Sequence, residues 1–352
     1  MKAGTRALFA GLGCLGIAVG GCRSLPWVRM DLSGRQRAYL EAQSRTPADL
    51  GVDVSRSGEG RFRIRQVYRM SPDVRADARL KPTRAAGKLV IPIEINGVPM
   101  DALVDTGATF SMVEMSVART CKLTPIGPEL IELPSLTFSG IAGSVMAVAN
   151  DMTIGGVRIE SVPFGIMHRI PGLQGSDTDV RVVLGHDLLR QFGQVWFEYR
   201  HRRIRLLGTA AAESPSDASV LGRQPFAFTP SGLVKVEGRL NFGEAIEVVF
   251  DSGGGFGLWL PQTMARDLQL SGAAPPVEWQ IATSLFRPSM SRPLWSSSLT
   301  IGKVTLGPLA TYVGVIDGGD LEPAYAILGN HVFRRYSVAL DYRASEILFL
   351  KP

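Results

Sequence analysis

Two short motifs place carboxylates where they could act together. Asp105 opens an Asp-Thr-Gly triplet and Asp251 opens an Asp-Ser-Gly triplet, 146 residues further on. Each triplet follows an alternating apolar run that predicts a buried strand, and Gly107 or Gly253 can then turn the backbone sharply. Two carboxyls held about 3 Å apart cannot both ionise, so they share one proton and can act as general base and general acid at once.

Such a pair requires no metal, nucleophilic side chain or cofactor. One carboxylate activates a water while the other protonates the carbonyl oxygen under attack, and the roles reverse when the tetrahedral intermediate collapses. The alternative is that each aspartate only stabilises its own turn, which is common for this residue type. Two triplets at equivalent positions of a repeat favour the catalytic interpretation.

The chain after Lys88 carries one pattern twice. Alternating apolar residues and an Asn96-Gly97 turn predict a β-hairpin over 89–104. The second copy repeats the arm that leads to the aspartate and has a glycine, Gly243, at the turn. An internal duplication is the simplest explanation. Further matches, at offsets of 143 to 147 residues, are Thr153-Ile154-Gly155 with Thr300-Ile301-Gly302, Val183-Leu184-Gly185 with Ile327-Leu328-Gly329, and Phe197-Glu198-Tyr199-Arg200 with Leu340-Asp341-Tyr342-Arg343.

The duplication divides the chain into two lobes. We expect them at residues 88–207 and 223–352, joined by an Ala/Ser/Pro-rich linker at 208–222. Short alternating strands dominate both copies, with short helices near Val113, at 260–268 and after each Leu-Gly pair. The predicted fold class is therefore mostly β. A length of 352 residues with 45% hydrophobic and 20% charged residues excludes a disordered or coiled-coil chain.

At this point a resemblance to a known family is plain. The run from Leu103 to Thr109 resembles the active-site loop of retropepsin-like aspartic proteases, and the stretch from Ala326 to Tyr336 is similar to the closing segment of a pepsin C-terminal lobe. The resemblance covers nearly everything after Lys88. It implies a bilobal pepsin-like acid-protease fold, built from two tandem retropepsin-like repeats with pseudo-twofold symmetry through the paired aspartates.

The resemblance also implies a role for the residues of the two loops. Asp105 and Asp251 would be the catalytic pair of an aspartic endopeptidase. The hydroxyls of Thr106 and Ser252 would bond across the lobe interface to the backbone of the partner loop. Ser252 is expected to be the looser support, because it lacks the β-branch that stiffens a threonine side chain.

The loops depart from the family pattern in two ways. Ala108 and Gly254 stand where pepsin-type lobes have a hydroxyl residue, and the loss of these donors predicts a pH optimum less acidic than that of pepsin. The Gly253-Gly254-Gly255 run is softer than the family loop and could hold Asp251 less firmly. It leaves open a protein that has kept the fold without activity.

A glycine-rich segment of the first copy resembles the tip of a retropepsin flap. We expect one flap, from the first copy, since the matching stretch 283–293 has no glycine. An ordinary glycine turn between two strands is the alternative. The candidate residues are Gly140, Ile141, Ala142 and Gly143.

The first 22 residues predict export. Lys2 and Arg6 precede a short apolar stretch that ends in small residues before Cys22, which is typical of a signal peptide over 1–21. The ending resembles the lipobox of bacterial lipoproteins and implies lipidation of Cys22; an ordinary signal with an incidental cysteine is the alternative. We expect a membrane-anchored lipoprotein at the periplasmic face, and Arg23 after the cysteine favours the outer membrane.

Basic charge is concentrated before the lobes. Residues 23–88 hold 15 basic and 7 acidic residues, a balance of +8, whereas residues 89–352 hold 21 and 25, a balance of −4. Proline, glycine and weak periodicity over residues 22–87 predict a partly ordered basic stalk. Its charge could face anionic lipid or simply be solvated. The basic run at 201–205 is interpreted as a solvated sheet edge.

No other motif competes with the aspartates. The four histidines have no metal-ligand spacing, no serine-hydrolase elbow occurs, and Cys121 is expected to be a small buried hydrophobe. We therefore expect no metal, no cofactor and no nucleic-acid partner. The predicted protein is a monomer that cleaves an extended polypeptide. The alternatives are a catalytically silent lipoprotein that binds peptides or assists assembly, and pairing of the copies between two chains.

Overall fold

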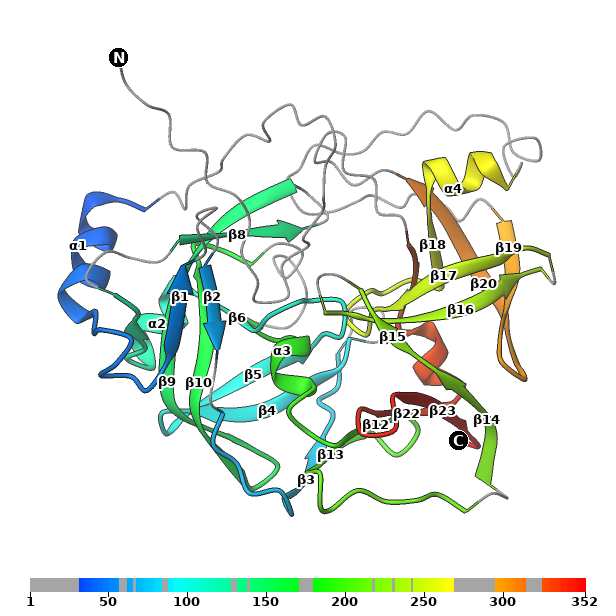
Figure 1. The fold of residues 1–352 in the computed structure, drawn as a ribbon, viewed down its shortest axis with the longest axis horizontal. Coiled ribbons are helices and arrows are strands. Elements are labelled where there is room, and N and C mark those ends of the chain that lie inside the picture. Colours follow the sequence, from blue (N-terminus) through cyan, green and yellow to red (C-terminus); the bar gives the residue numbers. More distant parts are fainter. Residues whose placement is uncertain are drawn as a thin grey trace.

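The structure of the chain is a computed structural model. It describes residues 32–56, 62–65, 68–83, 88–127, 132–137, 140–170, 180–216, 219–229, 232–241, 243–268, 295–314 and 325–352. These residues form two β lobes with a third sheet between them (Figure 1). Within these ranges no helix is long and apolar enough to cross a membrane. The predicted signal peptide and Cys22 lie outside the described residues.

Six strands of the first lobe form a closed ring. Their order is β10, β6, β11, β5, β4 and β9, and β9 pairs back with β10. The shorter strands β7 and β8 pair with β9 outside the ring. The elements of this lobe are β4 (Val90–Ile95), β5 (Val98–Val104), β6 (Met112–Glu114), α2 (Met115–Thr120), β7 (Thr124–Pro125), β8 (Glu132–Thr137), β9 (Gly140–Ile154), β10 (Val157–Met167), β11 (Val182–Leu184) and α3 (His186–Leu189).

The second lobe repeats this ring. Its order is β20, β18, β21, β17, β16 and β19, closed by the pairing of β19 with β20. In each ring the strand before the aspartate pairs in parallel with the strand that ends in Leu-Gly, β5 with β11 and β17 with β21. The predicted bilobal, pepsin-like fold of tandem repeats is therefore confirmed. The elements are β15 (Ala227–Phe228), β16 (Val234–Leu240), β17 (Ala245–Phe250), β18 (Leu258–Pro261), α4 (Gln262–Asp267), β19 (Trp295–Ile301), β20 (Val304–Gly314), β21 (Ala326–Leu328) and the 3₁₀ helix η3 (Asn330–Arg334).

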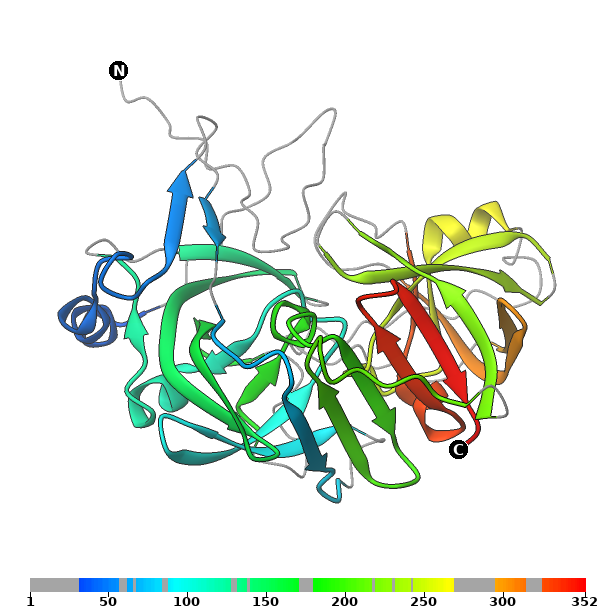
Figure 2. The ribbon, with the colours of Figure 1, turned by 60° about the horizontal axis from the view of Figure 1, so that its bottom comes forward.

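A six-stranded central sheet joins the lobes. Its order is β14, β23, β22, β12, β13 and β3, so that three strands come from each half of the chain (Figure 2). The halves meet where β12 pairs antiparallel with β22, with Trp196 opposite Ala339 at the middle of the register. The strands are β3 (Arg75–Arg79), β12 (Gln194–Glu198), β13 (Arg203–Leu207), β14 (Val220–Pro225), β22 (Ser337–Asp341) and β23 (Glu346–Leu350).

Turns and helices largely follow the sequence patterns. Asn96 and Gly97 have φ angles of 49° and 76°, the pair of positive values that a type I′ hairpin turn requires. In the second copy the positive φ, 49°, belongs to Asn241 at the start of a longer connection. The predicted helices are present as α2, α3, α4 and η3.

The segment predicted to be a partly ordered basic stalk holds regular elements in its described residues. Helix α1 begins at Ser33, which forms a capping box with Gln36. Leu40 of α1 is buried in the core of the first lobe. The segment gave little periodicity because it buries small or isolated side chains, such as Ala76 and Ala78 of β3. Its elements before β3 are α1 (Gly34–Gln43), β1 (Asp53–Arg56) and β2 (Phe62–Arg65).

Two glycine turns hold the outer strands of the central sheet in place. A Cβ on Gly155, at φ +54°, would lie 2.7 Å from the backbone nitrogen of Asp77 in β3. A Cβ on Gly302, at φ +56°, would lie 3.0 Å from the backbone oxygen of Arg223 in β14. The repeated Thr-Ile-Gly motifs therefore mark these contacts. Each copy includes a sheet strand that starts before the predicted lobe boundaries at 88 and 223.

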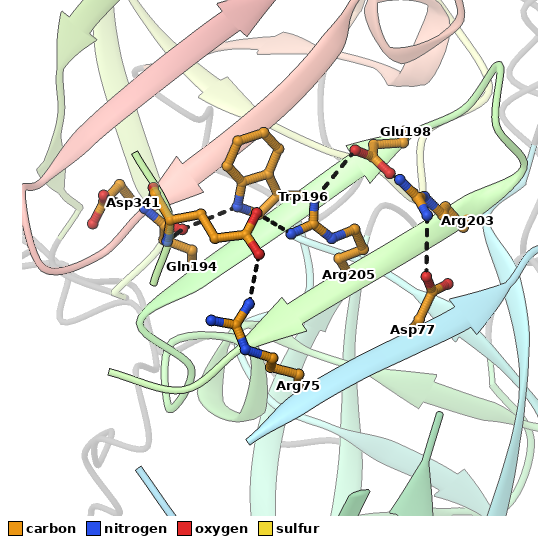
Figure 3. Close-up of polar contacts among 9 residues, drawn as sticks. Arg75, Asp77, Gln194, Trp196, Glu198, Arg203, Arg205 and Asp341 are labelled. Carbon is orange, nitrogen blue, oxygen red and sulfur yellow. Dashed lines mark hydrogen bonds and ion pairs between the residues drawn. The ribbon is translucent and has the colours of Figure 1, made fainter. Parts of the chain in front are cut away.

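The basic run at 201–205 is not a sheet edge, which corrects the sequence interpretation. β13 lies between β12 and β3, because the preceding segment supplies β3 to cover it. Its arginines and the linker carboxylate of Glu213 form one network of ion pairs on the sheet (Figure 3). The pairs are Arg203 with Glu198 and Asp77, Arg205 with Glu198 and Glu213, and Arg75 with Glu213.

Candidate active site

Each aspartate follows a strand whose last three residues are buried. The backbone N–H of Asp105, just after β5, donates to the carbonyl oxygen of Leu184 at 3.0 Å. The N–H of Asp251, just after β17, donates to Leu328 at 2.9 Å. These bonds extend the parallel pairing of the two rings by one residue. Both carboxylates therefore leave their sheets at equivalent points.

The hydroxyls after the aspartates lock the two loops together across the lobe interface. Thr106 Oγ1 donates to the carbonyl oxygen of Phe250 at 2.8 Å and accepts from the Ser252 N–H at 3.0 Å. Ser252 Oγ donates to Val104 at 2.8 Å and accepts from the Thr106 N–H at 2.9 Å. Both side chains have no exposed surface. The geometry is that expected from the resemblance, with serine and threonine in matching roles.

Glycine is required where each loop meets the opposite carboxyl. A Cβ on Gly107 would lie 2.7 Å from Cγ of Asp251, and a Cβ on Gly253 would lie 2.4 Å from Cγ of Asp105. These separations are far shorter than any van der Waals contact, so a side chain at either position would displace a carboxyl. The third residue of each triplet is thus fixed by the partner lobe.

The two carboxyls differ in the backbone N–H groups that reach them. Asp105 accepts from the backbone N–H groups of Gly107 at 2.8 Å and Ala108 at 3.2 Å, and Asp251 accepts from Gly254 at 2.8 Å. Desolvation raises the pKa of Asp105 above its ordinary value. Desolvation raises the pKa of Asp251 well above its ordinary value, and the charge of Asp105 and the bond to it raise it further. The additional backbone donor on Asp105 favours the ionised form of that carboxyl over that of Asp251.

The glycine-rich second loop is held more firmly than its composition indicates. A Cβ on Gly254 would lie 2.6 Å from both Oδ2 of Asp251 and Cε1 of Phe256. The carbonyl oxygen of Gly254 accepts from the N–H of Asn330 at 2.8 Å. The ring of Phe256 therefore fills the space that a side chain at position 254 would need, and the glycine is a packing requirement there.

Gly185 and Gly329, the glycines of the two Leu-Gly pairs, allow the backbone of each aspartate loop to pack against the start of the following helix. A Cβ on Gly185 would lie 2.4 Å from the backbone carbon of Phe110, and one on Gly329 would lie 2.3 Å from the backbone oxygen of Phe256. On the first side, the N–H of His186 then donates to Ala108 at 2.7 Å. Gly185 and Gly329, predicted as loop supports in the lobe cores, occupy equivalent places.

The flap candidate lies on a β-hairpin. Gly140, Ile141, Ala142 and Gly143 are the first four residues of β9, paired with Thr137, Leu136, Ser135 and Pro134 of β8. The candidate residues therefore form one arm of the hairpin next to its turn. The turn itself and the matching stretch 283–293 lie outside the described residues. Their role as a flap stays a prediction.

Three residues near the first aspartate were missed by the sequence analysis. The Tyr68 hydroxyl and the Ser111 hydroxyl each donate to Asp187, at 2.9 Å, and the N–H of Gly185 donates to Ser111 Oγ at 3.0 Å. Asp187 is only 4% exposed, and desolvation raises its pKa to about 6. An acidic residue inside an apolar run, Leu184 to Leu189, was the available signal.

The remaining polar candidates have structural roles. Cys121 is buried, and desolvation raises its pKa to about 11, as suits a small hydrophobe. His186 is buried, bonds to the Tyr342 hydroxyl at 3.1 Å, and has its pKa lowered to about 3 by desolvation and by Arg190. Within the described ranges no three His, Cys, Asp or Glu residues come together as a metal site.

Comparison with known proteins agrees with this geometry for the first copy. Residues 91–188 match the model of a family of aspartyl proteases. The matched segment includes Asp105, its loop and the Leu184-Gly185 support, and ends at Leu188, the third residue of α3. No curated protein matches the chain. The fold and the paired aspartates thus define a two-lobed protein whose first lobe is similar to aspartyl proteases.

Proposed function

We propose that the protein is an aspartic endopeptidase that hydrolyses peptide bonds with a water activated by Asp105 and Asp251. The observation that carries this proposal is the interlocking of two equivalent loops, which brings each buried aspartate against the loop of the other. The family match of the first copy supports it. Cleavage of a peptide library by the soluble protein, read by mass spectrometry, tests it directly.

The difference between the two carboxyls decides which one acts first as the base and which as the acid. Ionised Asp105 takes a proton from the attacking water while protonated Asp251 gives its proton to the carbonyl oxygen of the peptide. In the collapse of the tetrahedral diol the roles reverse: the proton on Asp105 passes to the leaving amine nitrogen, and Asp251 recovers the proton of the hydroxyl. The pair ends in its starting state, so the protein's own residues complete the cycle.

We propose an extended polypeptide substrate, with the β8–β9 hairpin as the flap that covers it. Both aspartates come from one chain, which supports a monomer as the active species rather than pairing of copies between chains. A catalytically silent module that binds peptides or assists assembly is the second candidate. The Gly253-Gly254-Gly255 run favours it, although Gly254 is packed against Phe256.

The pH dependence of cleavage follows from the directions of the two pKa shifts. Activity needs one proton on the pair, so it falls at low pH when Asp105 is protonated and at high pH when Asp251 loses its proton. Both pKa values are raised above 3.8, that of Asp251 strongly. We therefore expect kcat/KM, measured from pH 2 to 8, to peak at a less acidic pH than that of pepsin, whose pair titrates at about 1.5 and 4.7. A maximum near pH 2 would contradict this assignment.

We further propose export and lipid anchoring at the periplasmic face, with the outer membrane favoured. The basis is the predicted signal peptide over 1–21 and its ending before Cys22. Labelling of cells with a palmitate analogue should mark the wild-type protein and leave Cys22→Ala unmarked. Equal labelling of both, or of neither, would exclude Cys22 as the lipid site.

A further inference from the structure

A buried carboxylate outside the catalytic pair stands beside the first aspartate loop. Asp187, the second residue of α3, is only 4% exposed. One of its oxygens accepts from the Ser111 hydroxyl and the other from the Tyr68 hydroxyl, both at 2.9 Å. Buried carboxylates are retained only where such donors replace water. The three side chains therefore form a satisfied polar cluster inside the first lobe.

The cluster is tied to the loop that carries Asp105. Ser111 ends this loop, and its hydroxyl both donates to Asp187 and accepts from the N–H of Gly185 at 3.0 Å. The carbonyl oxygen of Ser111 accepts from the N–H of Gly165 at 2.9 Å. Nearer the aspartate, the carbonyl oxygen of Ala108 accepts from His186 at 2.7 Å. Movement of α3 or of Ser111 would thus shift the loop that positions Asp105.

The described residues of the second lobe hold no such cluster. The positions equivalent to Ser111 and Asp187 are Gly257 and His331, at offsets of 146 and 144 residues. The second loop nevertheless reaches the same hydrogen-bonded arrangement with its partner. The fold itself does not require the cluster, so its presence on one side points to a demand made only by the first aspartate, the ionised member of the pair.

Tyr68 reaches this cluster from outside the repeat. It belongs to the segment that precedes both lobes and is 119 residues from Asp187. The next residue, Arg69, fastens the segment to β10 through two backbone bonds with Glu160, at 3.2 and 3.0 Å. The segment continues into β3 of the central sheet. Its tyrosine is therefore held against α3 by the bridge at Arg69 and by β3, both of which follow it in the chain.

We propose that Tyr68 is a positioning residue for Asp105, acting through Asp187 and Ser111. The segment before the lobes is then a permanent part of the active site and is not a pro-segment removed for activation. This inference deepens the proposed protease function and rests on it. The hydroxyl of Tyr68 fixes the carboxylate of Asp187, which fixes Ser111 and with it the end of the catalytic loop.

The test compares single-atom changes in the full chain. Tyr68→Phe should lower kcat about tenfold with KM unchanged, because a hydrogen bond to a buried carboxylate is lost away from the substrate. The matched control is Tyr336→Phe, whose hydroxyl donates to Thr305 at 3.5 Å in the second lobe; its kcat should stay within twofold. Asp187→Asn, which keeps one acceptor oxygen, should retain more activity than Asp187→Ala.

Hydrogen exchange separates failure of this inference from failure of the protease assignment. Amides of residues 105–111 should exchange faster in Tyr68→Phe than in wild type and remain unchanged in Tyr336→Phe. If the wild type cleaves nothing, the exchange result still decides whether Tyr68 steadies the loop. A Tyr68→Phe protein with unchanged exchange, or with wild-type kcat in an active enzyme, would overturn the proposal.

Discussion

Replacement of Asp105 or Asp251 by asparagine should abolish peptide cleavage while the protein still folds. Asparagine keeps the shape of the carboxyl but neither shares the proton nor acts as a base. Loss of general acid–base catalysis costs on the order of 10²- to 10⁴-fold, and because each residue serves as both base and acid in one turnover, we expect the upper end for either variant. The loss should appear in kcat/KM at every pH between 3 and 8.

The measurement is cleavage of a peptide library by the soluble chain from residue 23 onward. Asp101→Asn is the matched control, since Asp101 makes only a surface ion pair with Lys81 at 2.6 Å; its activity should stay within twofold of wild type. Residual cleavage by a pure aspartate variant at a tenth of the wild-type rate would exclude the pair as the catalytic centre. If none of the folded proteins, wild type included, cleaves any peptide, the result would favour the peptide-binding module.

Thr106→Val should produce the largest loss of stability that a change of one atom can cause in this protein. Valine has the shape of threonine but leaves the carbonyl oxygen of Phe250 and the N–H of Ser252 without their partner. Each unsatisfied buried group costs about 1–3 kcal/mol, so the expected loss in the free energy of unfolding is about 2–6 kcal/mol. Ser252→Ala removes the mirror-image bonds and should cost a similar amount.

Chemical denaturation of the intact chain gives these values. Thr120→Val is the control, because its hydroxyl makes only an exposed bond to Ser116 within α2, at 3.0 Å; it should change stability by less than about 0.5 kcal/mol. A loss below about 1 kcal/mol for Thr106→Val would mean that the interlobe hydrogen bonds do not hold the loops together in solution.

The meeting of the two aspartate loops could be predicted because its signals are local. The triplets at Asp105 and Asp251, the hairpin turn at Asn96, and the Leu-Gly pairs each depend on a few consecutive residues, and the duplication marks the same features twice. Strand periodicity and turn chemistry then give the lobes. The difference between the two carboxyls could not be predicted, because it depends on which backbone N–H groups reach each of them.

The strand and the contacts of the segment before the lobes could not be predicted, because they depend on partners far away in the sequence. β3 has only Ala76 and Ala78 to bury, between charged residues, and it becomes a strand by pairing with β13. The same pairing turned the basic run at 201–205 from an expected edge into an interior strand. The bond from Tyr68 to Asp187 spans 119 residues, and no local pattern of apolar residues or turns encodes it.

The register between β12 and β22 relates the two halves of the chain by a local twofold symmetry. Trp196 lies opposite Ala339, its own counterpart at an offset of 143 residues. The pairs on either side are reciprocal: Val195 faces Leu340, the counterpart of Phe197, and Phe197 faces Val338, the counterpart of Val195. This self-complementary register is the isologous contact that two identical copies would make about a twofold axis. The contact between the two halves of one chain thus has the geometry of a homodimer interface. Around it the halves differ, since His331 stands at the position equivalent to Asp187.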